Sequence, residues 1–192
     1  MPKTTETTDK PLDQLEIAIE LERIRFELTE RKIQVKFLTD FSGFSFEEVT
    51  IPPTSQGSRL EIPYYIAEIL RRNSVIEDFD PDFPTSLQEL TAAVRNELRD
   101  GKLQPLPPFT HILAKELLLT PEDQESKFEN LEQKRQISKF NQLTLERISK
   151  ILRMTDSKDI STRKRNLTPS EEILFNKIVS WIQSWKAEFI QK

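Results

Sequence analysis

Four acidic residues near the middle of the chain have the spacing of a calcium-binding loop. They occupy the first, third, fifth and twelfth positions of an EF-hand loop: Asp78, Asp80, Asp82 and Glu89. The sixth position, where such a loop needs glycine for a sharp turn, is Phe83, and Pro81 and Pro84 stiffen the segment further. The pattern therefore favours an acidic linker over a calcium site.

Other residue types that catalyse reactions are scarce and scattered. His111 is the only histidine, so two imidazoles cannot share a metal ion. The carboxylate pairs Glu47-Glu48 and Glu171-Glu172 are neighbours in sequence, whereas acid–base catalysis needs two carboxyl groups that face one cleft. There is no cysteine and the three glycines are isolated, which excludes thiol chemistry and glycine-rich phosphate loops. We therefore expect no enzymatic activity, no metal and no cofactor.

A cluster of basic residues precedes the last predicted helix. Lys158 lies upstream of the run Arg163, Lys164 and Arg165. Such a cluster can neutralise phosphates and so contact DNA without regard to base sequence. No aromatic residues are interleaved with it for stacking on bases, and a solvated loop between two helices is the alternative interpretation. These four residues are the candidate DNA contact.

The composition indicates a helix-rich protein of a reducing compartment. The 192 residues include 28 Lys+Arg, 32 Asp+Glu and 36% hydrophobic residues, with a formal net charge of −4. This apolar content suffices for one or two modest cores. No apolar run approaches the roughly 20 residues of a membrane helix, and the polar start MPKTTETTDK is unlike a signal peptide. We expect a soluble cytoplasmic protein without a membrane segment.

The periodicity of the apolar residues predicts an α+β fold that is predominantly α. The first helix begins at Pro11 and has two apolar stripes, which indicates neighbours on two sides. One stripe contains Ile17, Leu21, Ile24 and Leu28, and the other contains Leu12, Leu15, Ile19 and Phe26. Residues 33–79 then follow as a small β-rich module. Its expected parts are a strand at 33–37, an aromatic hairpin around 41–46, a helix at 64–72 opened by Glu61-Ile62-Pro63, and a strand at 74–77.

Helical periodicity continues from residue 86 to the end of the chain. Ser86 and Glu89 predict a capping box for a helix near 86–100. Two further helices are predicted to start near 106–108 and 120–122. Thr168, Pro169 and Glu171 predict a second capping box for the last helix. We therefore expect a flexible tail at 1–10, an N-terminal helix with the β-rich module at 11–80, a proline-rich linker at 81–85, and a helical assembly domain at 86–192.

Large apolar residues recur at three- or four-residue spacing along the last helix. They are Leu174, Ile178, Trp181, Trp185 and Phe189. Such residues pack helices within one chain, but tryptophan is also enriched at the centres of protein interfaces. We select Trp181, Trp185 and Phe189, together with Phe140 on the preceding helix, as candidate subunit-interface residues.

Two segments resemble the small β-rich domain of GINS proteins. Residues 35–44, VKFLTDFSGF, look like the opening of that domain. Residues 62–70, IPYYIAEIL, followed by Val75, are similar to the GINS run of a hydrophobic residue, proline, two bulky residues, a hydrophobic residue, alanine and leucine. The chain departs from the family in having Asn73-Ser74 where a glycine usually stands, and in the long helix before the first strand. The β-rich module comes first, as in the archaeal subunit related to the second and third eukaryotic GINS subunits.

The resemblance, which covers residues 33–80, implies a non-catalytic scaffold in DNA replication. Two copies of this chain would join two copies of a second, longer GINS subunit in a heterotetramer. That complex would bridge the MCM helicase and a RecJ-like protein at the chromosomal replication fork, with primase or polymerase as further partners. The alternative function is a nucleic-acid-binding regulator that uses the loop Arg163-Lys164-Arg165.

Overall fold

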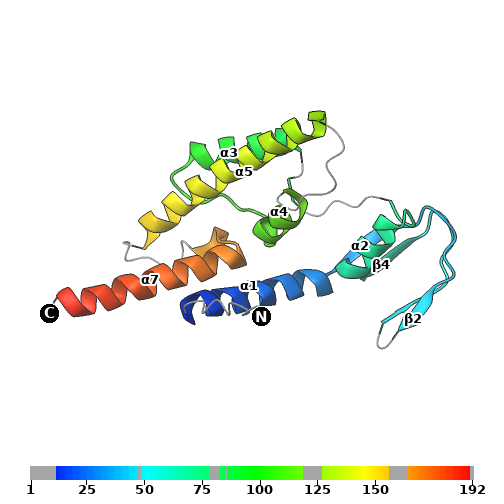
Figure 1. Ribbon diagram of the computed structural model, residues 1–192, viewed down its shortest axis with the longest axis horizontal. Helices are drawn as coiled ribbons and strands as arrows, with labels where there is room; N and C mark the ends of the chain where they lie inside the picture. Colours follow the sequence, from blue (N-terminus) through cyan, green and yellow to red (C-terminus); the bar gives the residue numbers. More distant parts are fainter. Residues whose placement is uncertain are drawn as a thin grey trace, which may run out of the picture.

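The computed structural model describes residues 12–46, 49–77, 83–84, 86–118, 127–155 and 164–190. The predicted tail at 1–10, most of the predicted linker at 81–85, and Asp78, Asp80 and Asp82 lie outside these residues. Figure 1 shows a β-rich part at one end of the molecule and a larger group of helices beside it. The predicted class, α+β with mainly helix, is therefore confirmed. Within the described ranges, no helix combines the length and the apolar character needed to cross a bilayer.

The β-rich part consists of two antiparallel strand pairs and one helix. β1 (Lys32–Lys36) pairs with β4 (Arg59–Pro63), and β2 (Phe44–Phe46) pairs with β3 (Val49–Ile51). α2 (Tyr64–Arg72) follows β4 directly. These elements enclose their own core of buried side chains, which consists of Val35, Phe37, Ile51, Ile62, Ile66, Ala67, Leu70 and Ile76. The expected small module therefore has a separate apolar interior.

Two details of this part differ from the sequence-based expectation. The helix predicted at 64–72 is confirmed as α2, with Pro63 at its N-cap, but residues 59–63 before it form β4, a strand that was not predicted. The strand forms because its backbone pairs with β1, a distant partner that local periodicity does not reveal. Residues 74–77 contribute one bridge, between Ile76 and Phe37, instead of a strand. Ser74 has a positive φ of 54°, so the chain turns sharply just before this bridge.

The helical part contains elements from both ends of the chain. They are α1 (Leu12–Glu30), α3 (Leu87–Arg99), α4 (Thr110–Leu118), α5 (Lys127–Met154), the short 3-10 helix η1 (Lys164–Asn166) and α7 (Pro169–Phe189). Both predicted capping boxes are present, at Ser86 with Glu89 and at Thr168 with Glu171. The predicted helix start at 120–122 lies outside the described residues.

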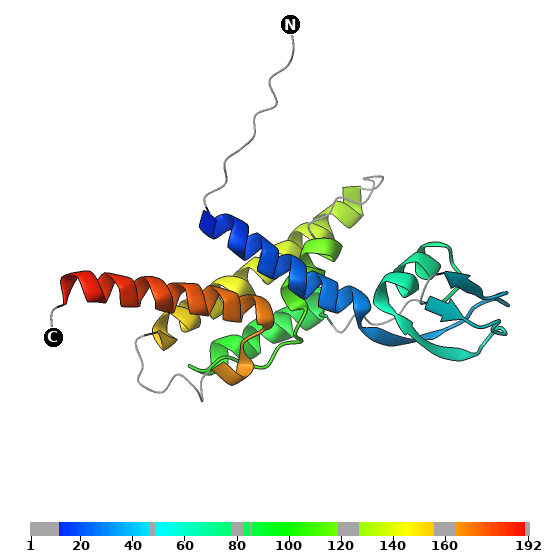
Figure 2. The same cartoon turned by 90° about the horizontal axis from the view of Figure 1, so that it is seen from below.

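The long first helix belongs to the helical core, although we expected it to group with the β-rich module. Ile24 and Leu28 of α1 are buried in one cluster with Leu90 of α3, Leu113 of α4 and Phe140 of α5. Figure 2 shows α1 crossing α7 and reaching the β-rich part only at its own C-terminal end. Burial of the Ile24 stripe needs a broad apolar surface, and α3, α4 and α5 provide it. The chain therefore enters the β-rich part near residue 31 and is back in the helical cluster by Phe83, so α1 packs with the helices that follow the β-rich part.

Candidate interaction surface

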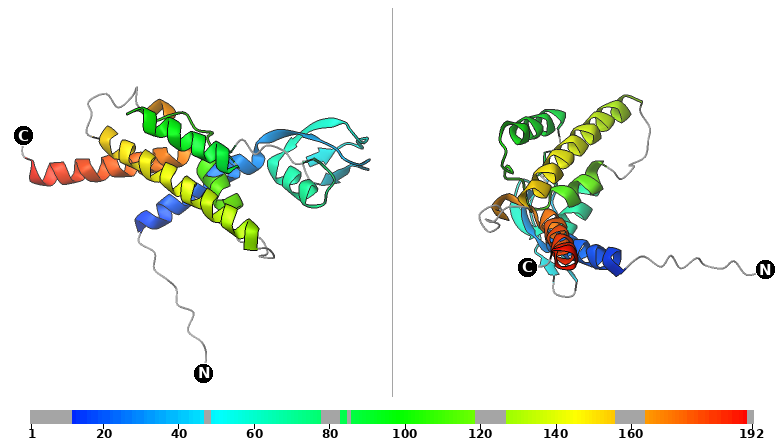
Figure 3. Two further views of the ribbon diagram at one scale, coloured as in Figure 1. Left: turned by 90° about the horizontal axis from the view of Figure 1, so that it is seen from above. Right: turned by 90° about the vertical axis from the view of Figure 1, so that its left-hand side faces the viewer.

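The C-terminal part of α7 extends beyond the core and has an aromatic face. Trp181, Trp185 and Phe189 are 56%, 59% and 67% exposed. The rings of Trp185 and Phe189 lie 5.0 Å apart, and the four-residue spacing places all three side chains along one side of the helix. Figure 3 shows that the last turns of α7 continue past every other element. We call residues 180–190 the α7 arm.

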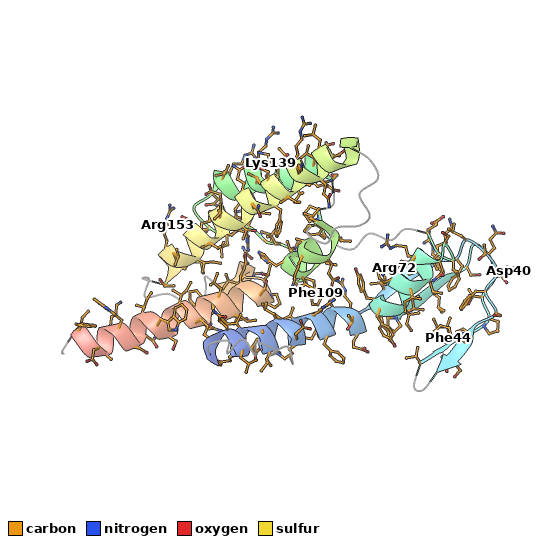
Figure 4. All side chains as sticks on the ribbon, in the orientation of Figure 1. Asp40, Phe44, Arg72, Phe109, Lys139 and Arg153 are labelled. Atoms are coloured by element: carbon orange, nitrogen blue, oxygen red, sulfur yellow. The ribbon has the colours of Figure 1, made fainter. Side chains whose placement is uncertain are left out.

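The aromatic face of the arm continues the side of α7 that packs against the core. Phe175 is buried with Ile151 and Met154 of α5 and with Leu103. Ile178 packs against the same cluster, and Trp185 follows two helical turns later on the same side. Arg153, labelled in Figure 4, lies near the end of α5, and the side chains of the arm extend beyond that point, where the described residues place no helix or strand opposite them. The arm therefore presents an apolar surface of the kind that normally lies inside a protein.

A second apolar surface lies on the outer side of α1. Leu15, Ile19 and Phe26 are each more than half exposed, whereas Ile24 and Leu28 are buried. Phe26 is two residues from each buried position, which turns it to the opposite side of the helix. The two predicted stripes therefore lie on opposite sides of the helix, and the described residues cover only the one that contains Ile24 and Leu28.

A third exposed row of apolar side chains lies on α5, and its residues were not among the predicted interface residues. Leu131, Leu145 and Leu152 are about half exposed or more and are separated by multiples of seven residues. A search for seven-residue repeats would have detected them, because this spacing keeps side chains on one face of a helix. This row adds to the apolar surface that the isolated chain presents to solvent.

Phe140 does not belong to the exposed surface, so its selection as an interface residue is corrected. It is 7% exposed, and its ring packs against the rings of Phe83 and His111 at centroid distances of 6.2 and 5.8 Å. Phe140 was selected together with the aromatic residues of α7, but its side chain points inward because other helices cover this side of α5. Phe140 is a core residue of this chain.

Two of the four candidate DNA-contact residues lie in the described part of the structure. Lys158 and Arg163 lie outside the described residues, and Lys164 and Arg165 belong to η1. The ammonium group of Lys164 donates to Asn176 Oδ1 at 3.0 Å and lies 5.1 Å from the centre of the Phe175 ring. Lys164 is therefore held against α7 of its own chain. Its contacts are those of a residue that fastens η1 to the helix.

A fully buried arginine joins four segments of the helical part. Arg147 of α5 is 0% exposed. It donates to Glu97 of α3 at 2.9 Å and to the carbonyl oxygen of Gln104 at 2.7 Å. It also donates to the carbonyl oxygen of Asn166 at 2.8 Å and to both carboxylate oxygens of Glu171, at 2.6 and 2.8 Å. These bonds use all five N–H groups of the guanidinium.

A buried lysine one turn later completes this network. Lys150 Nζ donates to Glu97 Oε1 at 2.7 Å, to the carbonyl oxygen of Lys102 at 2.9 Å, and to the carbonyl oxygen of Glu97. Two positive groups therefore face two carboxylates, so the network is neutral as a whole. A buried charge is tolerated when it is paired and fully hydrogen-bonded.

Arg147 and Glu171 each stabilise the ionised form of the other. Burial alone would raise the pKa of Glu171, but hydrogen bonds and attraction from Arg147 outweigh it, so the pKa lies below its usual value. Burial would likewise lower the pKa of Arg147, and the bonds and charge of Glu171 and Glu97 raise it instead. Both groups are therefore ionised at neutral pH.

His111 lies beside this network and, with its neighbours, contains the residue types of a nucleophilic triad. Its Nδ1 lies 3.0 Å from Ser170 Oγ and 3.3 Å from Thr168 Oγ1. Its Nε2 is 3.8 Å from Glu171 Oε1, too far for a hydrogen bond, and both oxygens of Glu171 already accept bonds from Arg147. Burial lowers the pKa of His111, which favours the neutral ring. The geometry fits a packing role, and the described residues contain no cluster of side chains that could hold a metal ion.

The chain matches no protein-family model and no curated protein. The geometry of the surface and the resemblance in residues 33–80 therefore support the functional conclusion by themselves.

Proposed function

We propose that this chain is a non-catalytic scaffold subunit of a GINS-type complex in DNA replication. The observation that carries the proposal is the α7 arm, which exposes Trp181, Trp185 and Phe189 along one side. Buried aromatic side chains each cover roughly 150–250 Å², so these three residues alone leave on the order of 300 Å² of apolar surface in water. The largest apolar patch on a typical monomer is about 300–600 Å² and is often functional, and here the exposed residues of α1 add to the area of the arm.

The position of the second surface supports an assembly with more than one neighbour. The aromatic side of the arm continues the core-facing side of α7, whereas the exposed stripe of α1 lies opposite its buried stripe. A stable interface buries about 800 Å² per partner, more than the arm alone can offer. Two separate faces suit a heterotetramer, in which two copies of this chain join two copies of a longer GINS-like subunit.

The resemblance of residues 33–80 supplies the biological setting of the proposal. A small β-rich domain followed by a helical assembly domain is the order of the archaeal GINS subunit that it resembles. In this setting the complex links the MCM helicase with a RecJ-like protein at the replication fork in the cytoplasm, with primase or polymerase as further partners. The chain contributes surfaces to this complex and no catalytic group.

The test is the mass of the particle with and without a partner. The isolated chain has a mass of 22.5 kDa. In size-exclusion chromatography with light scattering, we expect self-association of the chain alone, and a complex with two copies of each subunit after co-expression with the GINS-like subunit of the same genome. Replacing Trp181, Trp185 and Phe189 together by serine should weaken the complex at least tenfold, because these residues form the predicted centre of the interface.

A control variant distinguishes the loss of the aromatic contacts from the loss of the α7 helix itself. Gln183 and Lys186 are exposed on the same arm and lie on the side of the helix away from Trp181, so replacing both by serine should change the affinity by less than about threefold. A monodisperse 22.5 kDa particle that binds no GINS-like subunit would overturn the proposal.

A further inference from the structure

The direction of the α7 arm follows from the preceding part of the helix, which packs on α5 through Phe175 and Ile178 and contacts α1 through the ion pair of Lys177 with Glu16. Phe189 lies 18 residues beyond Glu171 on this helix, a distance of about 27 Å at 1.5 Å per residue. A tilt of roughly 10° at the start would therefore move the end of the arm by roughly 5 Å. An interface formed by both the arm and other parts of the molecule needs this tilt to be fixed.

Apolar contacts alone fix such an angle poorly. The start of α7 packs on Leu103, Ile151 and Met154 through Phe175. Contacts of this kind are individually non-directional, and interdigitated side chains favour classes of crossing angle with a scatter of about 15–20°. Hydrogen bonds of the guanidinium group depend on direction, and its planar fork matches a carboxylate in two places at once.

We propose that Arg147 sets the direction in which the α7 arm leaves the molecule. Its two bonds to Glu171 hold the first turn of α7, and its bond to the carbonyl oxygen of Asn166 holds the segment just before that turn. The same guanidinium is anchored to α3 through Glu97 and to the 103–104 loop through Gln104. Arg147 is thus a positioning residue that orients α7 relative to α3 and α5. That this orientation serves assembly rests on the proposed function.

The charge balance of the network permits a variant that removes the fork without leaving a lone buried charge. Arg147→Met combined with Glu171→Gln removes one positive and one negative group, and Lys150 and Glu97 remain paired. Glutamine at this position can still complete the capping box with Thr168. Apolar replacement of a buried ion pair often leaves stability unchanged or raises it. This double variant is expected to fold and to lose only the directional bonds.

The orientation is measurable in the full chain when the labelled protein is diluted with unlabelled chain, so that only distances within one molecule contribute. The sequence contains no cysteine, so spin labels can be placed by Arg95→Cys on α3 and Glu188→Cys on the arm, both at exposed positions. Double electron–electron resonance should give a single narrow distance distribution for the parent chain. In the double variant we expect a shifted distribution or one at least twice as broad, at unchanged helical content.

Two further variants keep the result interpretable. Arg147→Lys retains the charge but not the fork, and should broaden the distribution even if the double variant does not fold. Glu89→Gln makes the same chemical change as Glu171→Gln in the exposed capping box of α3, away from Arg147, and should leave the distribution unchanged. A parent-like distribution in every Arg147 variant that folds would overturn the proposal.

Affinity for the GINS-like subunit distinguishes this proposal from the proposed function. If both hold, the double variant binds at least tenfold more weakly than the parent while its aromatic residues are intact. A parent chain that binds no partner, but whose arm loses its fixed distance in the double variant, would overturn the proposed function and support the role of Arg147. A parent chain that binds its partner, with a double variant that keeps both distance and affinity, would overturn only the role of Arg147.

Discussion

Single residues around Arg147 show how an ionic group is kept inside a mainly apolar helical core. Glu171 accepts bonds from Arg147 and from the backbone N–H of Thr168, so its carboxylate is also the reciprocal acceptor of the α7 capping box. One side chain therefore caps the helix and ties it to α5. Protonation of this carboxyl would weaken both functions together.

The pH dependence of folding should show this coupling. The folded-state pKa of Glu171 lies below its usual value of 4.5, so its contribution to stability is complete above about pH 4.5 and is lost as the pH falls through the lowered pKa. In urea unfolding at pH 7, 4.5 and 3, the combined Arg147→Met and Glu171→Gln variant should lose less stability on acidification than the parent chain. Glu188→Gln, the same change in an exposed carboxyl of the arm, should retain the loss seen in the parent chain. Equal acid losses in all three proteins would contradict the assignment.

At the scale of helices and strands, the sequence predicts those features whose interacting residues lie close together in the chain. The two capping boxes were predicted because all their atoms lie within four consecutive residues. β4 was missed because its partner β1 lies far away in the chain. Arg147 could not be singled out either, since Glu97 and Glu171 are separated from it by 50 and 24 residues. The exposed aromatic face of α7 was predicted as an apolar stripe, but only the packing of the other helices reveals that the stripe is uncovered.

Two glycines in the β-rich part give an element-scale prediction. Gly43 has φ +77° and leads into β2, and a Cβ there would lie 2.6 Å from the carbonyl oxygen of Ile51. Gly57 has φ +80° and open space around it. Gly57→Ala should therefore cost only the strain of a left-handed residue, about 1–2 kcal/mol. Gly43→Ala should cost at least about 1 kcal/mol more, because β3 must also move.

Urea unfolding of both variants provides the measurement. The two substitutions are chemically identical and lie in the same part of the fold, so each controls for the other. Equal losses of stability would show that the close approach of Gly43 to β3 has no energetic effect.

At the scale of the whole molecule, the two largest apolar clusters of the described residues, one β-rich and one helical, meet around Ile33 and Tyr64. The β-rich core is formed by residues 35–76, and the main helical core by α1, α3, α4 and α5. Ile33 packs against both, and Tyr64 of α2 is buried in the helical core. This junction lets each interior be perturbed separately.

Amide hydrogen exchange should show that the β-rich and the helical interiors unfold separately. Ile62→Ala in the β-rich core and Leu113→Ala in the helical core should each cost about 2–5 kcal/mol locally. We expect Ile62→Ala to accelerate amide exchange mainly in residues 32–76, and Leu113→Ala mainly in the helices. Uniform acceleration across the chain in both variants would show that the two interiors unfold as one unit.

Both tryptophans of the chain, Trp181 and Trp185, lie on the α7 arm. The intrinsic fluorescence of the protein therefore reports on that arm and scarcely on either interior. Emission near that of indole in water is the expected spectrum of the chain at concentrations too low for self-association. A blue shift on mixing with a tryptophan-free partner would follow coverage of this helix in real time, with no dye attached.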